Sequence, residues 1–348
     1  MNQVTPINVG QIPAVDARNI VRTTRDIAKL TNFSIPLPDD YLQDTVRRVS
    51  LYLKVVDATL RESFPMLLTS IQNSYGQKYF SVIDELKTEL DNPELSADDR
   101  ALFNTEIAYF KASVVTMLDK VSAKFISQSE SVGKQALDIY KLEIGDRINP
   151  TLQRAKERMA RISNQLTEVS KTKESYVQQR DTLIMAQDVI RETNLADIFQ
   201  TYLPDSAALD GLNLTNPKKE AIKQAIQLVK KLLGVLSTAI KYSELATARN
   251  NLDKEIDKLT QAIAGLNSER KLAEDTLGDV LAVGEVNQLR MVALKEIDLV
   301  ASIWKQSTMS LGILKNSDFT KDDVAALLNR YKVHLEVFSS DYHNVLLT

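Results

Sequence analysis

The sequence predicts an all-α protein, an elongated helical bundle joined to a long antiparallel coiled-coil hairpin that carries a helical tip. The 348 residues are 44% hydrophobic and 26% charged but only 6% aromatic, with 10 glycines and 9 prolines, a balance typical of helices and coiled coils. Apolar residues recur at three- and four-residue steps over long stretches, and two of these stretches flank a central insert. Helix packing is therefore expected to determine the fold.

Composition and motifs argue against catalysis. The absence of cysteine excludes disulfides, thiolate metal sites and cysteine nucleophiles. The net charge of -3 creates no global field that would attract nucleic acid. The two histidines, His334 and His343, are too far apart for a metal-binding pair on one helical turn, and no HExxH, P-loop, GxGxxG or GxSxG motif occurs. The sequence predicts no enzyme, no cofactor, no metal, no catalytic residue and no nucleic-acid partner.

No targeting segment is evident. The first residues, MNQVTPINVGQIPAVD, have neither a basic nor an apolar region, so export is expected to use a route other than a classical signal peptide. No stretch reaches about 18 uncharged apolar residues, so the chain is expected to be soluble as made.

Residues 1–150 are expected to form an N-terminal arm and the helices of a tail bundle. Four prolines interrupt the arm around one short helix, and regular helical periodicity begins at Tyr41. Ser96 with Asp99 resembles a capping box that opens a helix, and we expect this helix to run to Ile148, before Asn149 and Pro150.

Residues 151–183 and 242–284 are expected to form the two coiled-coil arms. In the first arm, eight of ten positions at heptad spacing from 152 to 183 are apolar, and the second arm has a similar seam from Leu245 to Val280. About 40 residues in each arm would give a hairpin of roughly 60 Å. Residues 285–348 are expected to return to the tail bundle, with Thr320 and Asp323 capping the last helix.

Residues 184–241 form the expected tip, and its charge divides into two halves. Residues 181–216 have six acidic side chains against Arg191 alone, whereas residues 217–241 have six lysines against Glu220 alone. The second half is predicted to form one amphipathic helix from Pro217 to Lys241, because an α-helix turns 100° per residue and this turn brings its apolar residues to one side. The opposite charges could cancel across a folded tip.

This helix is expected to enter a membrane. Its 25 residues would rise roughly 37 Å, enough to cross a hydrocarbon core of about 30 Å. A single copy would not cross, since each lysine at mid-depth costs about 2.5 to 3.5 kcal/mol, but in a ring the polar faces could line water. The predicted inserting residues are Ile222, Ala225, Ile226, Val229, Leu232, Leu233, Leu236 and Ile240. The face predicted to line a lumen or to contact lipid headgroups contains Lys219, Lys223, Lys230, Lys231 and Lys241.

The alternative is that the apolar face packs under the acidic half of the tip. The expected partners are then Leu195, Ile198, Phe199, Tyr202 and Leu203. The two interpretations are compatible as two states of one switch. Acid or an anionic surface would act as a trigger by weakening the pairing of the two halves.

The layout as a whole resembles a known family, the B components of binary α-pore-forming toxins of the xenorhabdolysin (XaxAB) and YaxAB type, which share a cytolysin A-like architecture. The likeness rests on IPLPDDYLQDT, on the heptad arms and on the tip sequence PKKEAIKQAIQLVKKLLGVLSTAIKYS, and it covers essentially the full chain. It implies a secreted subunit that is soluble alone and joins an A component as an oligomer in a target-cell membrane, where the pore lyses host cells. It implies no catalytic residues. The alternative function is an intracellular coiled-coil scaffold or adaptor whose tip binds a protein partner.

Overall fold

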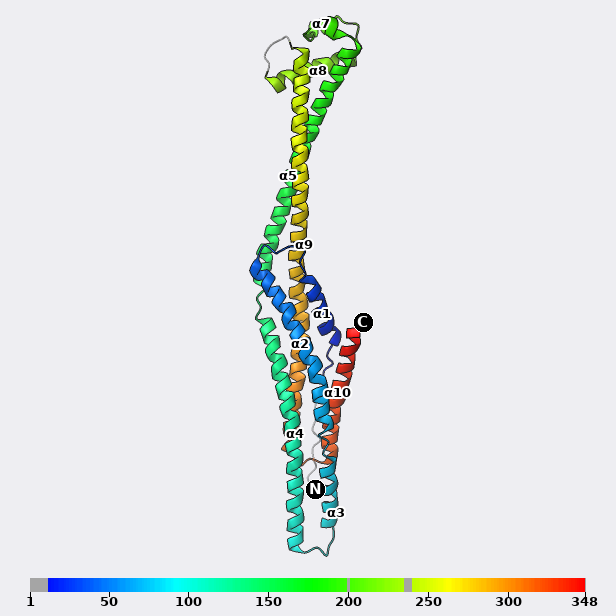
Figure 1. The fold of residues 1–348 in the computed structure, drawn as a ribbon. Coiled ribbons are helices and arrows are strands. Elements are labelled where there is room, and N and C mark those ends of the chain that lie inside the picture. The colour runs from blue at the N-terminus through cyan, green and yellow to red at the C-terminus, as the bar shows by residue number, and fades with distance from the viewer. Residues whose placement is uncertain (1–11, 199–200, 235–239, 348) are drawn as a thin grey trace. The chain divides into compact units, whose positions relative to one another are not determined.

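The computed structural model describes residues 12–198, 201–234 and 240–347 of the chain (Figure 1). Within these residues the regular structure is helical, and the only β pairing is an isolated bridge between Tyr202 and Lys241. The predicted all-α class is confirmed. The helices are α1 (Ala17–Leu30), α2 (Asp40–Gln72), α3 (Gln77–Leu90), α4 (Ala97–Tyr140), α5 (Gly145–Glu192), α6 (Leu195–Ile198), α7 (Ser206–Asp210), α8 (Asn216–Leu233), α9 (Tyr242–Lys315) and α10 (Lys321–Leu347).

The chain divides into two compact units. The first contains Met1–Leu152 and Gly278–Thr348, and the second contains Gln153–Leu277. Helices α5 and α9 each contribute residues to both units. The second unit includes the tip, which contains the predicted site residues.

The first unit is a bundle with a continuous apolar core. Helix α2 contacts α1, α4 and α10, and α3 packs on α4. Phe64 of α2 meets Phe338 of α10 edge to face at a centroid distance of 5.0 Å, and Trp304 of α9 is fully buried. Such aromatic residues bury large areas and account for much of a core's stability. The expected N-cap is present at Ser96, whose hydroxyl accepts the backbone N–H of Asp99 and donates to the Asp99 carboxylate.

The predicted end of the fourth helix was wrong. Helix α4 ends at Tyr140, and Pro150 lies inside α5. The break falls at residues 141–144 because the buried guanidinium of Arg290, on α9, donates hydrogen bonds to the carbonyl groups of Ile139 and Leu142. A helix leaves its last four carbonyls without intrahelical partners, and this arginine satisfies two carbonyls at the break. Burial lowers the pKa of Arg290.

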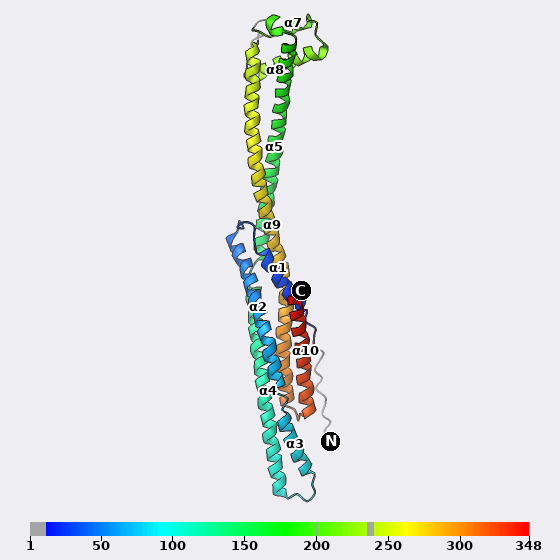
Figure 2. The ribbon, with the colours of Figure 1, turned by 45° about the vertical axis from the view of Figure 1, so that its right-hand side comes forward.

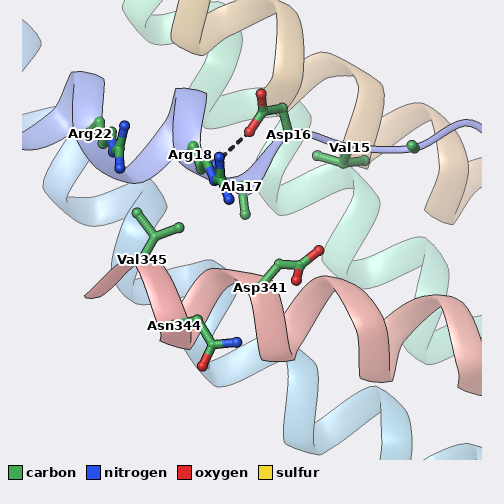
Figure 3. A pocket seen from close by; sticks show the side chains of 9 residues that line it. Val15, Asp16, Ala17, Arg18, Arg22, Asp341, Asn344 and Val345 are labelled. Carbon is green, nitrogen blue, oxygen red and sulfur yellow. Dashed lines mark hydrogen bonds between the residues drawn. The ribbon is translucent and has the colours of Figure 1, made fainter. Parts of the chain in front are cut away.

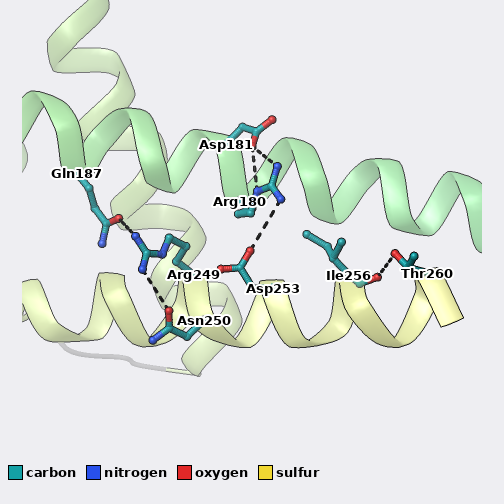
Figure 4. A network of polar contacts seen from close by, with 8 residues as sticks. All are labelled: Arg180, Asp181, Gln187, Arg249, Asn250, Asp253, Ile256 and Thr260. Carbon is teal, nitrogen blue, oxygen red and sulfur yellow. Dashed lines mark hydrogen bonds and ion pairs between the residues drawn. The ribbon is translucent and has the colours of Figure 1, made fainter.

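In the second unit, α5 and α9 lie side by side as the two arms of an antiparallel coiled coil (Figures 1 and 2). The heptad positions from 152 to 183 and those from Leu245 to Val280 are all buried or half-buried, which confirms both predicted seams. Arg180 occupies one polar heptad position, where it pairs with Asp181 at 2.8 Å and reaches Asp253 of α9 at 3.9 Å (Figure 4). Polar contacts of this kind at a seam favour one register over others.

Candidate functional site

The apolar face of α8 is covered in this structure. Ile222, Ala225 and Val229 are fully buried in the tip, as is Ile240 before α9. Three further predicted inserting residues, Ile226, Leu232 and Leu233, are half-buried against the same cluster, and Leu236 lies outside the described residues. The buried residues that cover the face come from α5, α9 and the acidic half of the tip: Leu183, Ala186, Ile190, Leu195, Leu203, Leu209, Leu245, Ala248 and Leu252.

Packing under the acidic half is therefore confirmed where the structure describes it. Leu195 and Leu203 belong to the buried cluster, whereas Tyr202 remains 46% exposed. The side chain of Ile198 and the whole of Phe199 lie outside the described residues. The tip therefore has a small core of its own, to which α8 contributes its apolar face.

The expected 25-residue helix is not present as one element. Helix α8 ends at Leu233, and Gly234 follows in the left-handed conformation with φ 65° and ψ 24°. A glycine in this conformation is a common helix terminator because it has no Cβ to clash with the following carbonyl. The 18 residues of α8 rise about 27 Å. Among the helices of the described chain, none has the length and mean hydropathy required of a membrane span.

The predicted pairing of opposite charges is present at the start of α8. The Lys218 ammonium lies 2.9 Å from the carboxylate of Glu192, and that of Lys223 lies 2.8 Å from Asp210. Lys219 donates to the backbone carbonyl of Asp210 at 2.9 Å. Exposed pairs of this kind contribute little stability because water screens them, so they hold the tip closed only weakly.

At the other end of α8 the lysines have no such partner among the residues that the structure describes. Lys230 and Lys231 lie in the last turn, and Lys241 directly precedes α9. None of the three ammonium groups makes an ion pair with a residue that the structure describes. The predicted lysine face therefore has two parts. Lys219 and Lys223 contact the acidic half of the tip, whereas Lys230, Lys231 and Lys241 have no ion pair among the described residues.

A backbone latch connects the two ends of the tip. The N–H of Leu203 donates to the carbonyl of Ile240 at 2.8 Å, and the N–H of Tyr242 donates to the carbonyl of Thr201 at 3.1 Å. These bonds surround the antiparallel bridge between Tyr202 and Lys241. Sequence analysis missed this latch, because a single bridge between residues nearly forty positions apart leaves no periodic signal.

The electrostatics of Asp210 predict how the tip responds to acid. The hydrogen bond and charge of Lys223 hold the pKa of the Asp210 carboxyl below its usual value. A lowered carboxyl pKa contributes stability that is present above the unfolded value of about 3.9 and is lost only as the pH falls through the folded value. The Asp210 carboxylate consequently remains ionised between pH 7 and pH 5, which argues against an acid trigger at this carboxylate.

We therefore expect Asp210→Asn to change the rate of membrane leakage by the same factor at pH 7 and at pH 5. Dye release from vesicles by the variant and the parent protein, each mixed with the A component, measures this factor. Asp188→Asn is a suitable control, because among the described residues this exposed carboxylate has its ion pair with Arg191 on its own helix. A factor that approaches one at pH 5 would show that the pair titrates in this range.

The first unit also contains a hollow, of about 590 Å³, between α1 and α10 (Figure 3). Its lining includes Arg18, Arg22 and Asp341, but none of the predicted site residues. Asp16 at its edge accepts the backbone N–H of Arg18 and so caps α1. Within the described residues no cluster of His, Cys, Asp or Glu could hold a metal ion. The tip is thus the feature with the clearest functional pattern.

The described chain thus combines a bundle, a coiled-coil hairpin and a tip with a concealed amphipathic helix. No protein-family model and no curated protein matches the chain. Among solved structures, it is similar to PaxB from Photorhabdus luminescens, with a TM-score of 0.87 and 26% identity over 96% of this chain and 98% of that one.

The chain is also similar to XaxB from Xenorhabdus nematophila, with a TM-score of 0.85 and 25% identity over 95% of this chain and 99% of that one. The XaxAB pore complex from the same organism gives a TM-score of 0.77 at 25% identity over 96% and 99% of the two chains. The predicted resemblance to the B components of the xenorhabdolysin type is confirmed.

Proposed function

We propose that this protein is a subunit of a two-component pore-forming cytolysin, which assembles with an A component into an oligomeric membrane pore and so lyses host cells. The observation that carries the proposal is the tip, where a strongly amphipathic helix is hidden in a small separate core. The likeness to XaxB and to the XaxAB pore complex over almost the whole chain supports it. No comparison favours the scaffold alternative, and no catalytic step is part of the proposal.

The energetics of the tip allow the buried face to exchange its protein neighbours for lipid. Ile222, Ala225 and Val229 lose water contact in the tip core and would also lose it among acyl chains, so leaving the core does not forfeit their hydrophobic stabilisation. The polar connections of the described tip include the surface ion pairs, the hydrogen bond from Lys219 to the Asp210 carbonyl and the two hydrogen bonds of the latch. In the membrane form we place the apolar residues of α8 against lipid and its lysines toward water or headgroups.

A leakage assay tests this function. Vesicles loaded with a quenched dye are mixed with the chain alone, with the A component alone and with both. Release by the mixture is expected to exceed release by either protein alone by at least an order of magnitude, and stable oligomers should be recoverable from the membranes. A mixture that releases no dye from vesicles or from target cells would reject the function and favour the scaffold.

A further inference from the structure

The lysines of α8 are divided between two roles by their surroundings. Lys218 and Lys223, in the first half of the helix, are paired with Glu192 and Asp210, so the chain itself neutralises them. Lys230 and Lys231, in the last turn, have no ion pair among the described residues, although they lie on the same helix. The fold thus leaves a local positive charge on a protein whose net charge is -3.

Lys241 is a third lysine of the tip and lies beside an exposed aromatic ring. Ile240 and Tyr242, on either side of it, pack in the same apolar cluster as Leu232 and Leu233. It pairs with Tyr202 in an antiparallel bridge, and residues directly opposite in such a pair have Cβ atoms about 4.5 to 5.5 Å apart on the same face. Both side chains are exposed. The nearest acidic group in sequence, Glu244, accepts the backbone N–H of Lys241 at 2.7 Å.

Half-buried apolar side chains accompany these charges. Leu232 and Leu233 directly follow Lys231 and are only partly covered by the tip core. Lysines with adjacent apolar residues and a tyrosine are the combination that binds the interface of an anionic membrane, where the ammonium groups meet headgroup phosphates and the ring lies at headgroup level.

We propose that Lys230, Lys231, Lys241 and Tyr202 form a basic tip surface that docks the closed protein on anionic phospholipid before the tip opens. The inference rests on the proposed function and adds the lipid class and the site of first contact. The lysines paired with Glu192 and Asp210 take no part in this docking and become available only after opening.

The test is sedimentation of the chain, without the A component, with vesicles of phosphatidylcholine alone or mixed with phosphatidylserine. Binding is expected only to the mixed vesicles and should weaken at high salt, because the attraction is screened. The triple variant Lys230→Gln, Lys231→Gln, Lys241→Gln should lose roughly a hundredfold in partition coefficient, given about a fivefold contribution for each lysine.

A matched control is Lys54→Gln, Lys134→Gln, Lys305→Gln, which removes the same charge from exposed positions of the first unit. Equal losses in the two triple variants, or equal binding to both vesicle types, would overturn the proposal. So would a triple tip variant that binds the A component more weakly but binds vesicles normally, since the surface would then serve a protein contact. Dye release from phosphatidylcholine vesicles with the A component tests the proposed function separately, because it does not require anionic lipid.

Discussion

A disulfide between positions 202 and 241 is expected to abolish membrane lysis, and its reduction is expected to restore it. Tyr202 and Lys241 are opposite each other in the latch, and the flanking hydrogen bonds identify a non-hydrogen-bonded antiparallel pair. Residues in such pairs have Cα atoms about 4.5 Å apart, within the range that a disulfide spans. The variant Tyr202→Cys, Lys241→Cys would therefore close a loop that contains α7 and α8.

The chain is well suited to this experiment because it has no cysteine of its own. Dye release and lysis by the oxidised variant with the A component should fall by at least two orders of magnitude and return to the level of the reduced variant on addition of a thiol. Each single cysteine variant, treated with the same oxidant, controls for loss of the side chain. Full lysis by a completely oxidised sample would mean that α8 reaches the membrane without opening the latch.

Two glutamates on the apolar face of α8 are expected to block lysis while leaving the closed protein folded. Ile226 and Leu233 are half-buried, so the closed tip can direct the new carboxylates toward water. Among acyl chains the same groups cannot remain hydrated, and each charge at mid-depth costs about 2.5 to 3.5 kcal/mol on insertion scales. Ile226→Glu with Leu233→Glu should reduce dye release by at least a hundredfold.

The matched control places the same charge on the opposite face of the same helix. Gln224→Glu with Gln227→Glu adds two carboxylates at exposed positions, which the proposed membrane form places toward water or headgroups, and should retain most of the activity. Circular dichroism and size-exclusion chromatography should give the same closed fold for both double variants. If both lose lysis equally, the effect follows from net charge and not from contact of this face with lipid.

Local patterns in the sequence were sufficient for much of the fold and the site. The heptad seam from Leu245 to Val280 depends only on the identity of residues three and four apart, which an α-helix brings to one side irrespective of distant contacts. The N-cap at Ser96 is local for the same reason. The amphipathic pattern of α8 and the split in charge before and after Pro217 are also properties of neighbouring residues.

Other features of the tip required the tertiary structure. The position of Gly234 was visible in the sequence, but the strength of the surrounding pattern predicted a longer helix than α8. The latch between Tyr202 and Lys241 and the choice of Lys223 as the partner of Asp210 depend on how the chain turns back on itself. Contacts between residues distant in sequence leave no periodic pattern of apolar residues, so the sequence pattern does not indicate which of these residues meet.

The sequence by itself determined an all-α protein, the two coiled-coil seams and an amphipathic tip helix with a lysine face. The tertiary structure decided where the helices end, which residues cover the apolar face of α8 and which of its lysines have no ion pair among the described residues. Arg290 shows the physical reason, because its guanidinium satisfies the carbonyls of Ile139 and Leu142 about 150 positions earlier and so ends α4 before Pro150. Helical periodicity is a property of adjacent turns, whereas the ends of helices and the exposure of charges depend on partners that only folding brings together.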